Sequence, residues 1–310
     1  MAKYRIITFD GGGLRGVVTT GLLRQVLAQP GCENLLRSAD LFAGTSTGGL
    51  IALGLAAGNP LDTVHNLYLD RADDIFKDTV WDNVKDLGKA VGADYSTTGL
   101  RKEVRAILGD KTLGQLSPRV LITSFDLDNE DIGGGNRSWK PKLWHNFPGS
   151  GNDRKATAWK VALYTSAAPT YFPSVDGYID GGVFANNPSM CALAQTQDQR
   201  YQPTPGMHEI VMLSLGTGIT QEYIRKKKLD WGYAQWVKPL INIMMDGVAG
   251  ISDFQCKQLL GDRYLRVSPK LPKNYQIDDH RKVQQMARVG EDADITELVA
   301  WLQEHWFPTD

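Results

Sequence analysis

Short, uninterrupted apolar runs rich in β-forming residues recur along this chain and constrain its fold more than any other feature. The clearest are residues 4–9 (YRIITF) and 209–218 (EIVMLSLGTG). A continuous apolar run of this length is typical of a strand that is buried on both faces of a parallel sheet. Segments with helical spacing lie between the runs, so the sequence predicts an α/β protein whose mostly parallel sheet has helices on both faces.

The same patterns place the other elements. Further strands are expected at 39–46, 119–128, 140–147 and 263–269. Helices are expected at 17–29, 47–58, 157–169 and 293–306, and residues 61–116 are expected to be helical with polar turns. No low-complexity linker or internal repeat interrupts the pattern, so we expect a single domain over residues 1–310.

Charge and cysteine content exclude several classes of protein. A net charge of −1 leaves no strongly basic face, so a nucleic acid polymer is not an expected partner. The basic run at 225–228 (RKKK) is interpreted as a solvated helix end. Cys32, Cys191 and Cys256 are far apart, which suggests neither a disulfide framework nor a zinc site and favours a reducing, cytoplasmic compartment.

The sequence predicts no membrane-spanning segment. The chain begins with a strand rather than an apolar leader, and its longest apolar stretch, 49–58, is too short and too rich in glycine to span a bilayer. Any contact with a membrane is therefore expected to be peripheral. The acidic segment 126–131 (DLDNED) lacks the glycine and the final glutamate of a calcium loop, so we predict no metal there.

A serine flanked by glycines ends the predicted strand 39–46. In GTSTG, Gly44 and Gly48 stand two positions on either side of Ser46. Glycines at this spacing allow a sharp turn from strand to helix that exposes the serine hydroxyl, which is the geometry of a nucleophile elbow. The motif alone also fits an ordinary Gly/Ser turn, so its interpretation depends on the rest of the sequence.

A second glycine-rich turn, DGGGLRG, follows the first strand. Gly11, Gly13 and Gly16 match the G-x-G-x-x-G pattern of a dinucleotide site. That interpretation requires an acidic residue at the end of the second strand, where this chain has the serine motif instead. We therefore favour an oxyanion hole, in which peptide N–H groups converge at the start of a helix and Arg15 adds charge or orients the loop. A tight turn without a ligand is the third alternative.

A serine nucleophile needs a base, and the sequence offers two kinds of candidate. The first kind is histidine, and the chain has five: His65, His145, His208, His280 and His305. None of them lies in a glycine-rich turn suited to a triad. The other candidate is Asp180 in GYIDGGVFANNP, where a short β segment delivers a carboxylate and two glycines allow close backbone approach. A carboxylate that reaches the serine hydroxyl could accept its proton directly, and burial would raise its basicity.

In this order, DGGGLRG, GTSTG and the later DGG resemble the motifs of the patatin-like phospholipase family. Segments 165–173 (TSAAPTYFP), 185–188 (ANNP) and 213–218 (LSLGTG) also resemble that family. The resemblance runs over residues 4–218 and implies a three-layer α/β/α fold, with residues 219–310 as a helical C-terminal completion of the same domain.

The resemblance also implies roles for individual residues. Ser46 and Asp180 would form a catalytic dyad, and the oxyanion loop would consist of Gly11, Gly12, Gly13 and Arg15. The implied activity is calcium-independent hydrolysis of acyl esters in phospholipids or related lipids, of phospholipase A or lysophospholipase type, without a cofactor. It would need transient contact with a membrane surface, such as an inner membrane. Two alternatives stay open: a conventional Ser-His-Asp esterase, and a phospholipase effector that a small nucleotide signal activates.

Two groups of apolar residues are candidates for contact with lipid. The first lies at helical spacing within 236–260 and consists of Trp236, Leu240, Ile243, Met244, Val248, Ile251 and Leu259. This spacing favours packing against the sheet as core over an acyl-chain groove or a membrane contact. The second group is Trp139, Trp144 and Phe147.

Overall fold

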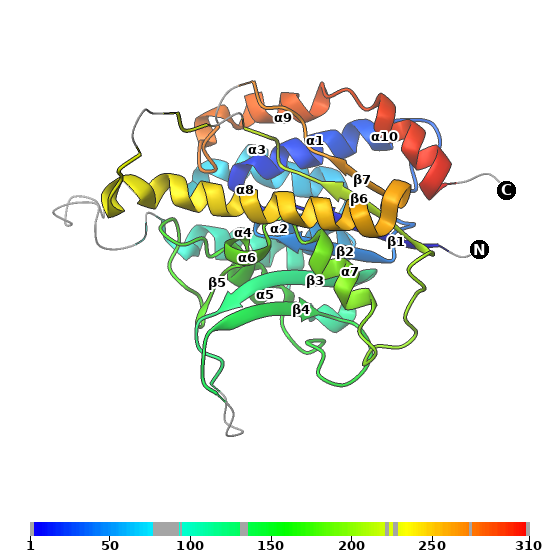
Figure 1. Cartoon of the computed structure of the whole chain (residues 1–310), viewed down its shortest axis with the longest axis horizontal. Helices are drawn as coiled ribbons and strands as arrows, with labels where there is room; N and C mark the ends of the chain where they lie inside the picture. The colour runs from blue at the N-terminus through cyan, green and yellow to red at the C-terminus, as the bar shows by residue number, and fades with distance from the viewer. Residues whose placement is uncertain are drawn as a thin grey trace.

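The computed structural model describes residues 3–76, 93, 95–130, 136–220, 223–225, 229–272 and 275–307. Within these residues the strands form one sheet in the order β4-β3-β2-β1-β6-β7, with β5 paired to β3 (Figure 1). The strands are β1 (Tyr4–Phe9), β2 (Leu41–Thr45), β3 (Arg119–Asp126), β4 (Lys140–His145), β5 (Tyr178–Asp180), β6 (Ile210–Leu215) and β7 (Tyr264–Val267). Each predicted strand is present, and its ends lie within three residues of the prediction.

Most of the sheet is parallel, as predicted. Strands β3, β2, β1, β6 and β7 run in one direction, while β4 and β5 are antiparallel to β3. The register pairs Phe9, the last residue of β1, with Gly44 of β2 and with Leu215 of β6. Because parallel strands end at the same edge of a sheet, the glycine turn after β1 lies beside the serine motif after β2.

Helices connect and cover the strands (Figure 1). They are α1 (Gly16–Leu27), α2 (Thr47–Ala56), α3 (Leu61–Phe76), α4 (Thr97–Leu108), α5 (Ala158–Ser166), α6 (Gly182–Ala185), α7 (Ser189–Thr196), α8 (Tyr233–Leu260), α9 (Val283–Glu291) and α10 (Thr296–Trp301). The predicted helical region 61–116 contains α3 and α4, and its residues 77–92 and 94 lie outside the described part of the chain.

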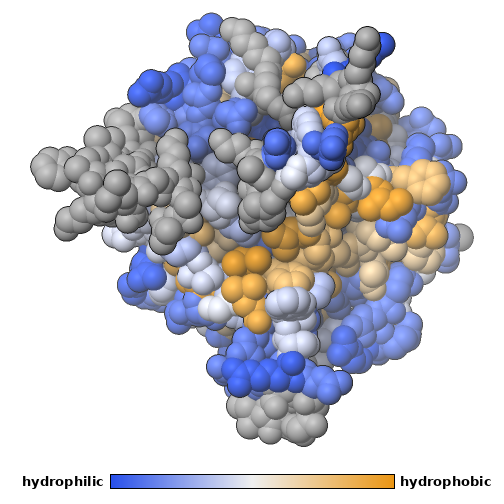
Figure 2. Space-filling view, turned by 60° about the vertical axis from the view of Figure 1, so that its left-hand side comes forward, coloured by the Kyte–Doolittle hydropathy of each residue, from blue (hydrophilic) through white to orange (hydrophobic). Residues whose placement is uncertain are grey.

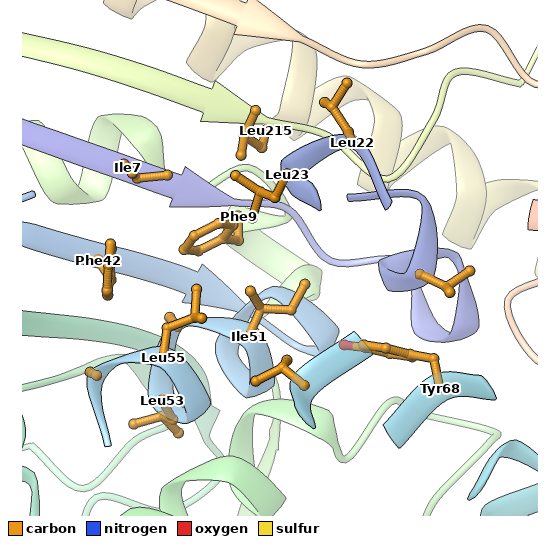
Figure 3. Packing of buried hydrophobic residues seen from close by; sticks show 14 of the residues in the cluster. Ile7, Phe9, Leu22, Leu23, Phe42, Ile51, Leu53, Leu55, Tyr68 and Leu215 are labelled. Carbon is orange, nitrogen blue, oxygen red and sulfur yellow. The ribbon is translucent and has the colours of Figure 1, made fainter. Parts of the chain in front are cut away.

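Apolar side chains project from both faces of the sheet, which explains the uninterrupted apolar runs. On β1, Ile7 and Phe9 join a buried cluster with α1, α2 and α9, as Figure 3 shows for its labelled residues. Ile6 points to the opposite face, where it joins a second cluster with Leu193 of α7 and Leu260 of α8. The sheet is therefore the middle of three layers, which confirms the predicted α/β/α sandwich.

The C-terminal segment is anchored in the core of the domain. Trp306 is fully buried in the same cluster as Leu22 of α1, and its indole N–H donates to Ser38 Oγ at 2.8 Å. The predicted last helix, 293–306, is present as α10 followed by a turn of π-helix over Leu302–Trp306. None of the helices in the described ranges is long and apolar enough to cross a membrane.

The structure corrects the expectation that the apolar stripe of 236–260 is core. Leu240, Ile243, Met244, Ile251 and Leu259 are all more than 40% exposed, because α8 uses other residues to contact the sheet. Helical spacing predicts an apolar face but does not say what covers it.

The second lipid-contact candidate is also corrected. Phe147 is 1% exposed and Trp144 packs against Tyr164 and Tyr178, so of this group Trp139 is the one that lies open to solvent.

Candidate active site

Ser46 stands at the tip of a strained turn between β2 and α2. Its backbone angles, φ 54° and ψ −125°, lie where residues with a side chain are rarely found. The backbone N–H of Ser46 donates to Thr165 Oγ1 at 2.8 Å, which helps to hold the turn. This is the geometry predicted for a nucleophile elbow.

The two glycines of the elbow are required by close approach of backbones. A Cβ on Gly44 would lie 2.2 Å from the carbonyl oxygen of Gly48. A Cβ on Gly48 would lie 2.1 Å from the carbonyl oxygen of Phe9 in the neighbouring strand. Both distances are far below van der Waals contact, so a larger residue at either position would push the turn away from the sheet.

Asp180 lies near Ser46 at the same edge of the sheet, on a different strand. It ends β5, where its register partner on β3 is Ser124, and its backbone N–H donates to the carbonyl oxygen of Ala167 at 2.9 Å. Its carboxylate lies close enough to the Ser46 hydroxyl for their interaction to lower the pKa of Asp180. Residues 134 positions apart in the sequence are thus brought into direct contact, because both lie at the ends of strands on one edge.

The environment of Asp180 raises the basicity of its carboxylate. The side chain is 4% exposed, and this burial raises its pKa from 3.8 to about 7. The interaction with Ser46 and the hydrogen bond from the N–H of Gly182, which donates to Oδ1 at 2.7 Å, oppose the rise without cancelling it. A carboxylate with a pKa near neutrality is a far better base than an exposed aspartate.

The glycine loop between β1 and α1 contacts the serine. A Cβ on Gly11 would lie 3.4 Å from Ser46 Cβ, so the two turns are in close contact. The N–H of Gly11 donates to the carbonyl oxygen of Asn186 at 2.9 Å and is not available to a ligand. The N–H groups of Gly12 and Gly13 donate to none of the described residues, which leaves them as candidate oxyanion donors at the start of the helix.

Residues from two distant segments hold this loop in place. Thr217, just after β6, donates its hydroxyl to the carbonyl oxygen of Gly11 at 2.8 Å. The N–H of Leu14 donates to the carbonyl oxygen of Ile277 at 2.7 Å. The φ of +58° at Gly13 favours glycine, and a Cβ there would meet the same Ile277 carbonyl at 2.3 Å.

A buried ion pair anchors the first residue of the loop motif. Asp10 is 3% exposed and accepts hydrogen bonds from both terminal nitrogens of Arg266 on β7. Burial raises the pKa of Asp10, and the charge of Arg266 opposes that rise. Arg15 is half-buried at the end of the turn Gly13–Arg15, and its charge also lowers the pKa of Asp10.

Two histidines are buried with partners of their own. His65 is hydrogen-bonded to Thr20 Oγ1 at 2.8 Å, and His145 packs edge-on against Phe147 and Tyr201. Burial lowers the pKa of both imidazoles. The other three are only partly buried or exposed: His208 precedes β6, His280 begins a short turn before α9, and His305 packs on Trp301.

The sequence predicted Ser46, Asp180 and the glycine loop as site residues, and the structure adds several residues around them that the sequence analysis did not name. Thr165, Asn186 and Thr217 lie in segments whose resemblance to the family was visible, so a signal for them existed. The segment 261–267 (GDRYLRV), which contains Arg266, resembles the family only weakly, and nothing in it predicts the pairing with Asp10. Among the described residues no group of three or more His, Cys, Asp or Glu side chains is arranged to hold a metal ion.

Comparison with known proteins identifies the family to which this chain belongs. The family profile described as "Patatin-like phospholipase" matches residues 7–193, which include the glycine loop, Ser46 and Asp180. This span is more than half of the 310 residues, and the chain therefore belongs to the patatin-like phospholipase family, a family of lipid hydrolases.

Individual relatives are similar over most of the chain. Protein teg of Priestia megaterium is 27% identical over 334 aligned positions, which cover 99% of this chain and 100% of that protein. A cGAMP-activated phospholipase of Escherichia coli (strain TW11681) is 33% identical over 233 positions, covering 69% of this chain and 62% of its own length. The solved structure of VipD from Legionella pneumophila overlaps 98% of this chain and 67% of its own, with a TM-score of 0.47 and 11% identity.

Proposed function

We propose that this protein hydrolyses acyl esters of phospholipids or related lipids through a dyad of Ser46 and Asp180. The observation that carries the proposal is the interaction of the serine hydroxyl with a buried carboxylate whose pKa is raised to about 7. The strained elbow holds the hydroxyl, and the glycine loop lies against it. This arrangement supplies a nucleophile, a base and oxyanion donors, the three parts that acyl transfer requires.

In the first step, Asp180 accepts the proton of Ser46 as Oγ forms a bond to the ester carbonyl carbon. The negative charge that develops on the carbonyl oxygen is stabilised by the N–H groups of Gly12 and Gly13. One such donor contributes about 3 kcal/mol to the transition state. When the tetrahedral intermediate collapses, the carbon–oxygen bond of the ester breaks and the proton passes from Asp180 to the departing alkoxide, which leaves as an alcohol.

In the second step, water replaces the alcohol. Asp180, again a carboxylate, accepts a proton from the water as its oxygen attacks the acyl carbon on Ser46. The intermediate collapses to a free carboxylic acid, and the proton returns to Ser46 Oγ. Because one carboxylate makes every proton transfer, the cycle needs no histidine, metal ion or other cofactor.

The rest of the chain is proposed to complete the same domain. Residues 219–310 add β7 to the sheet beside β6, pack α9 on α1 and supply Arg266 to the loop. A cytoplasmic protein that meets a membrane surface transiently fits the three cysteines without disulfide bonds, Cys32, Cys191 and Cys256.

The test is a panel of phospholipids, lysophospholipids and neutral esters, with products identified by mass spectrometry and a calcium chelator present. Wild-type protein should release fatty acid, whereas Ser46→Ala should release none above the background. Asp180→Asn should fold and be inactive. Full activity of Ser46→Ala would contradict the proposal, and loss of activity in His280→Ala with retention in Asp180→Asn would favour a conventional Ser-His-Asp esterase.

A second candidate function is that of a phospholipase whose activity a small nucleotide regulates. The name of one relative favours it. The relative from Escherichia coli that is 33% identical over 69% of this chain is named as a cGAMP-activated phospholipase. If this chain is regulated in the same way, its lipid hydrolysis will rise on addition of cGAMP, and Ser46→Ala will stay inactive with the nucleotide present. Equal hydrolysis with and without the nucleotide would argue against that regulation.

A further inference from the structure

Two consecutive asparagines follow α6, and both are buried: Asn186 is 6% exposed and Asn187 is 1% exposed. The side chain of Asn187 is used by the fold. Its Oδ1 accepts from the N–H of Ser189 at 3.0 Å, and its Nδ2 donates to the carbonyl oxygen of Ala249 at 3.4 Å. The side chain of Asn186 has no hydrogen bond to any residue that the structure describes, and its Oδ1 is enclosed.

An unpaired carboxamide in a buried position is unfavourable, because the group gives up its hydrogen bonds to water and gains none in return. Buried polar side chains therefore nearly always have a partner, and one that has none within the fold indicates a partner outside it. The neighbour of Asn186 shows that this segment can satisfy a buried asparagine. The free carboxamide of Asn186 thus points to a ligand of the site.

The carboxamide of Asn186 lies between the two loops that carry the site. Its Oδ1 is 2.3 Å from the position that a Cβ on Gly11 would take, and Ser46 Cβ is 3.4 Å from the same position. Toward the other loop, this Oδ1 is 3.5 Å from the Cβ position of Gly182, and Asp180 Oδ1 is 3.2 Å from that position. The proposed nucleophile and the proposed base therefore flank the carboxamide.

The glycine loop is built around this side chain. The φ angles of Gly12 and Gly13 are positive, whereas Gly11 has no such angle that would require a glycine. A side chain at position 11 is excluded because the carboxamide of Asn186 already fills its place. The N–H of Gly11 donates to the backbone carbonyl oxygen of Asn186 at 2.9 Å, which fixes the two segments to each other.

The surroundings of the site favour a strong hydrogen bond to a substrate. The parallel strands end at the left of Figure 1, and this side of the molecule comes forward in Figure 2, where hydrophobic surface gathers across the middle of the face. The Cε of Met245 lies 3.4 Å from the Cβ position of Gly182, so an apolar side chain borders the loop of the base. In apolar surroundings a donor that faces a developing charge stabilises it more than it would in water.

We infer that Asn186 is a further catalytic residue, whose side-chain N–H donates to the carbonyl oxygen of the ester as that oxygen becomes negative. This inference rests on the proposed dyad. When Ser46 Oγ forms its bond to the carbonyl carbon, the electron pair of the carbon–oxygen double bond moves to the oxygen, and Asn186 stabilises this charge without transferring a proton. The terminal torsion of an asparagine is soft, so Nδ2 can turn toward the oxyanion.

Asn186 adds a donor that the backbone of the loop does not supply. The N–H of Gly11 is used within the protein, which leaves the N–H groups of Gly12 and Gly13. A carboxamide is suited to this position because it is a neutral donor. A lysine or arginine there would lower the pKa of Asp180 and weaken it as a base, whereas Asn186 adds no charge.

The first test compares Asn186→Ala and Asn186→Asp on a water-soluble short-chain ester. We expect kcat/KM to fall on the order of a hundredfold or more in Asn186→Ala. Asn186→Asp keeps the shape of the side chain but replaces the donor by a negative charge, so it should lose at least as much. Activity of Asn186→Asp close to that of wild type would show that the side chain only fills space, and would overturn the inference.

Asn187→Ala is the matched control, because Asn187 is the adjacent buried asparagine and its hydrogen bonds lie within the fold. This variant should melt at a lower temperature than wild type but keep kcat/KM within about threefold. Asn186→Ala should melt no lower than wild type, since its carboxamide has no bond in the fold to lose. A lower melting temperature and a smaller loss of activity in Asn186→Ala than in Asn187→Ala would assign Asn186 a structural role instead.

The second test uses an alkyl trifluoromethyl ketone, to which a serine adds to give an oxyanion. Its inhibition constant should weaken in Asn186→Ala by about the same factor as kcat/KM falls, with KM for the ester changed less than about threefold. The loss in kcat/KM should be equal for an ethyl ester and a p-nitrophenyl ester. A loss that disappears with the p-nitrophenyl ester would place the carboxamide at the leaving alcohol and overturn the inference.

The inference and the proposed function fail separately. Full activity of Ser46→Ala refutes the dyad whatever the Asn186 variants do. An inactive Ser46→Ala together with Asn186→Ala and Asn186→Asp that match wild type, in both ester hydrolysis and ketone binding, leaves the dyad in place and refutes the role of Asn186.

Discussion

Arg266 on β7 holds Asp10, the first residue of the glycine loop, from a position 256 residues away in the sequence. Its two terminal nitrogens lie 3.2 and 2.5 Å from the two carboxylate oxygens of Asp10, and the first of them also donates to Ser214 Oγ at 2.9 Å. Both charged groups are largely buried. The loop that supplies the proposed oxyanion donors is therefore anchored by a strand outside the segment that the family profile matches.

The first prediction concerns this ion pair. Arg266→Gln leaves the buried Asp10 without its partner, so we expect the free energy of unfolding to fall by about 3–5 kcal/mol. The loosened loop should lower kcat on the order of tenfold to a hundredfold, with KM changed by less than about threefold. Arg266→Lys should recover part of kcat. Thermal unfolding and steady-state kinetics measure the two effects, and an equal loss in kcat for Arg266→Lys and Arg266→Gln would speak against positioning by the pair.

The second prediction concerns the elbow. Gly48→Ala would put a methyl group 2.1 Å from the carbonyl oxygen of Phe9, so the turn must shift. We expect a loss of about 3 kcal/mol or more in stability and no detectable hydrolysis. Gly250→Ala is the control, because Gly250 lies in α8 with nothing within 4 Å of its Cβ position. That variant should be as stable as wild type or slightly more so, and equal effects of the two substitutions would refute the steric argument.

The third prediction is a pH–rate profile. Asp180 must be ionised to accept the serine proton, and its pKa is raised to about 7. kcat/KM should therefore rise with pH, reach half of its maximum near pH 7, and fall about tenfold for each unit below that. A soluble ester is the suitable substrate, since its concentration does not depend on vesicle binding. A profile that stays flat between pH 5 and pH 8 would be inconsistent with Asp180 as the base.

The fourth prediction links the same pKa to stability. The folded protein holds the Asp180 proton up to about pH 7, whereas an unfolded aspartate releases it near its ordinary pKa of 3.8. Between these values the folded state binds more protons, so the contribution of Asp180 to stability is lost as the pH rises through this window. Asp180→Asn removes the buried charge and should be more stable than wild type at pH 8, by roughly 1–3 kcal/mol, and nearly equal to it at pH 4.

Chemical denaturation of both proteins at the two pH values measures this difference. Ser46→Ala serves as the reference for the change in stability that follows from losing the interaction of the serine hydroxyl with Asp180 alone. A stability difference between Asp180→Asn and wild type that is the same at pH 4 and pH 8 would show that burial does not raise the pKa of Asp180.

The sequence by itself determined the strands and the candidate site residues at their ends. Runs such as 4–9 must be buried on both faces because they have no polar side, and a parallel sheet is the structure that buries them. The glycines around Ser46 and in DGGGLRG are local signals, because only glycine allows two backbones to approach so closely. These signals, together with the resemblance to a known family, were sufficient to name Ser46, Asp180 and the glycine loop as candidates.

Only the tertiary structure decided what those residues touch. Three contacts join segments far apart in the sequence: the interaction of Ser46 with Asp180, the pairing of Arg266 with Asp10, and the hydrogen bond from the Gly11 N–H to Asn186. The same is true of α8, whose apolar spacing is equal for a covered and an open face, so exposure of Ile243 and Met244 could not be foreseen. Burial is a property of the packed chain, and the pKa of Asp180 depends on burial.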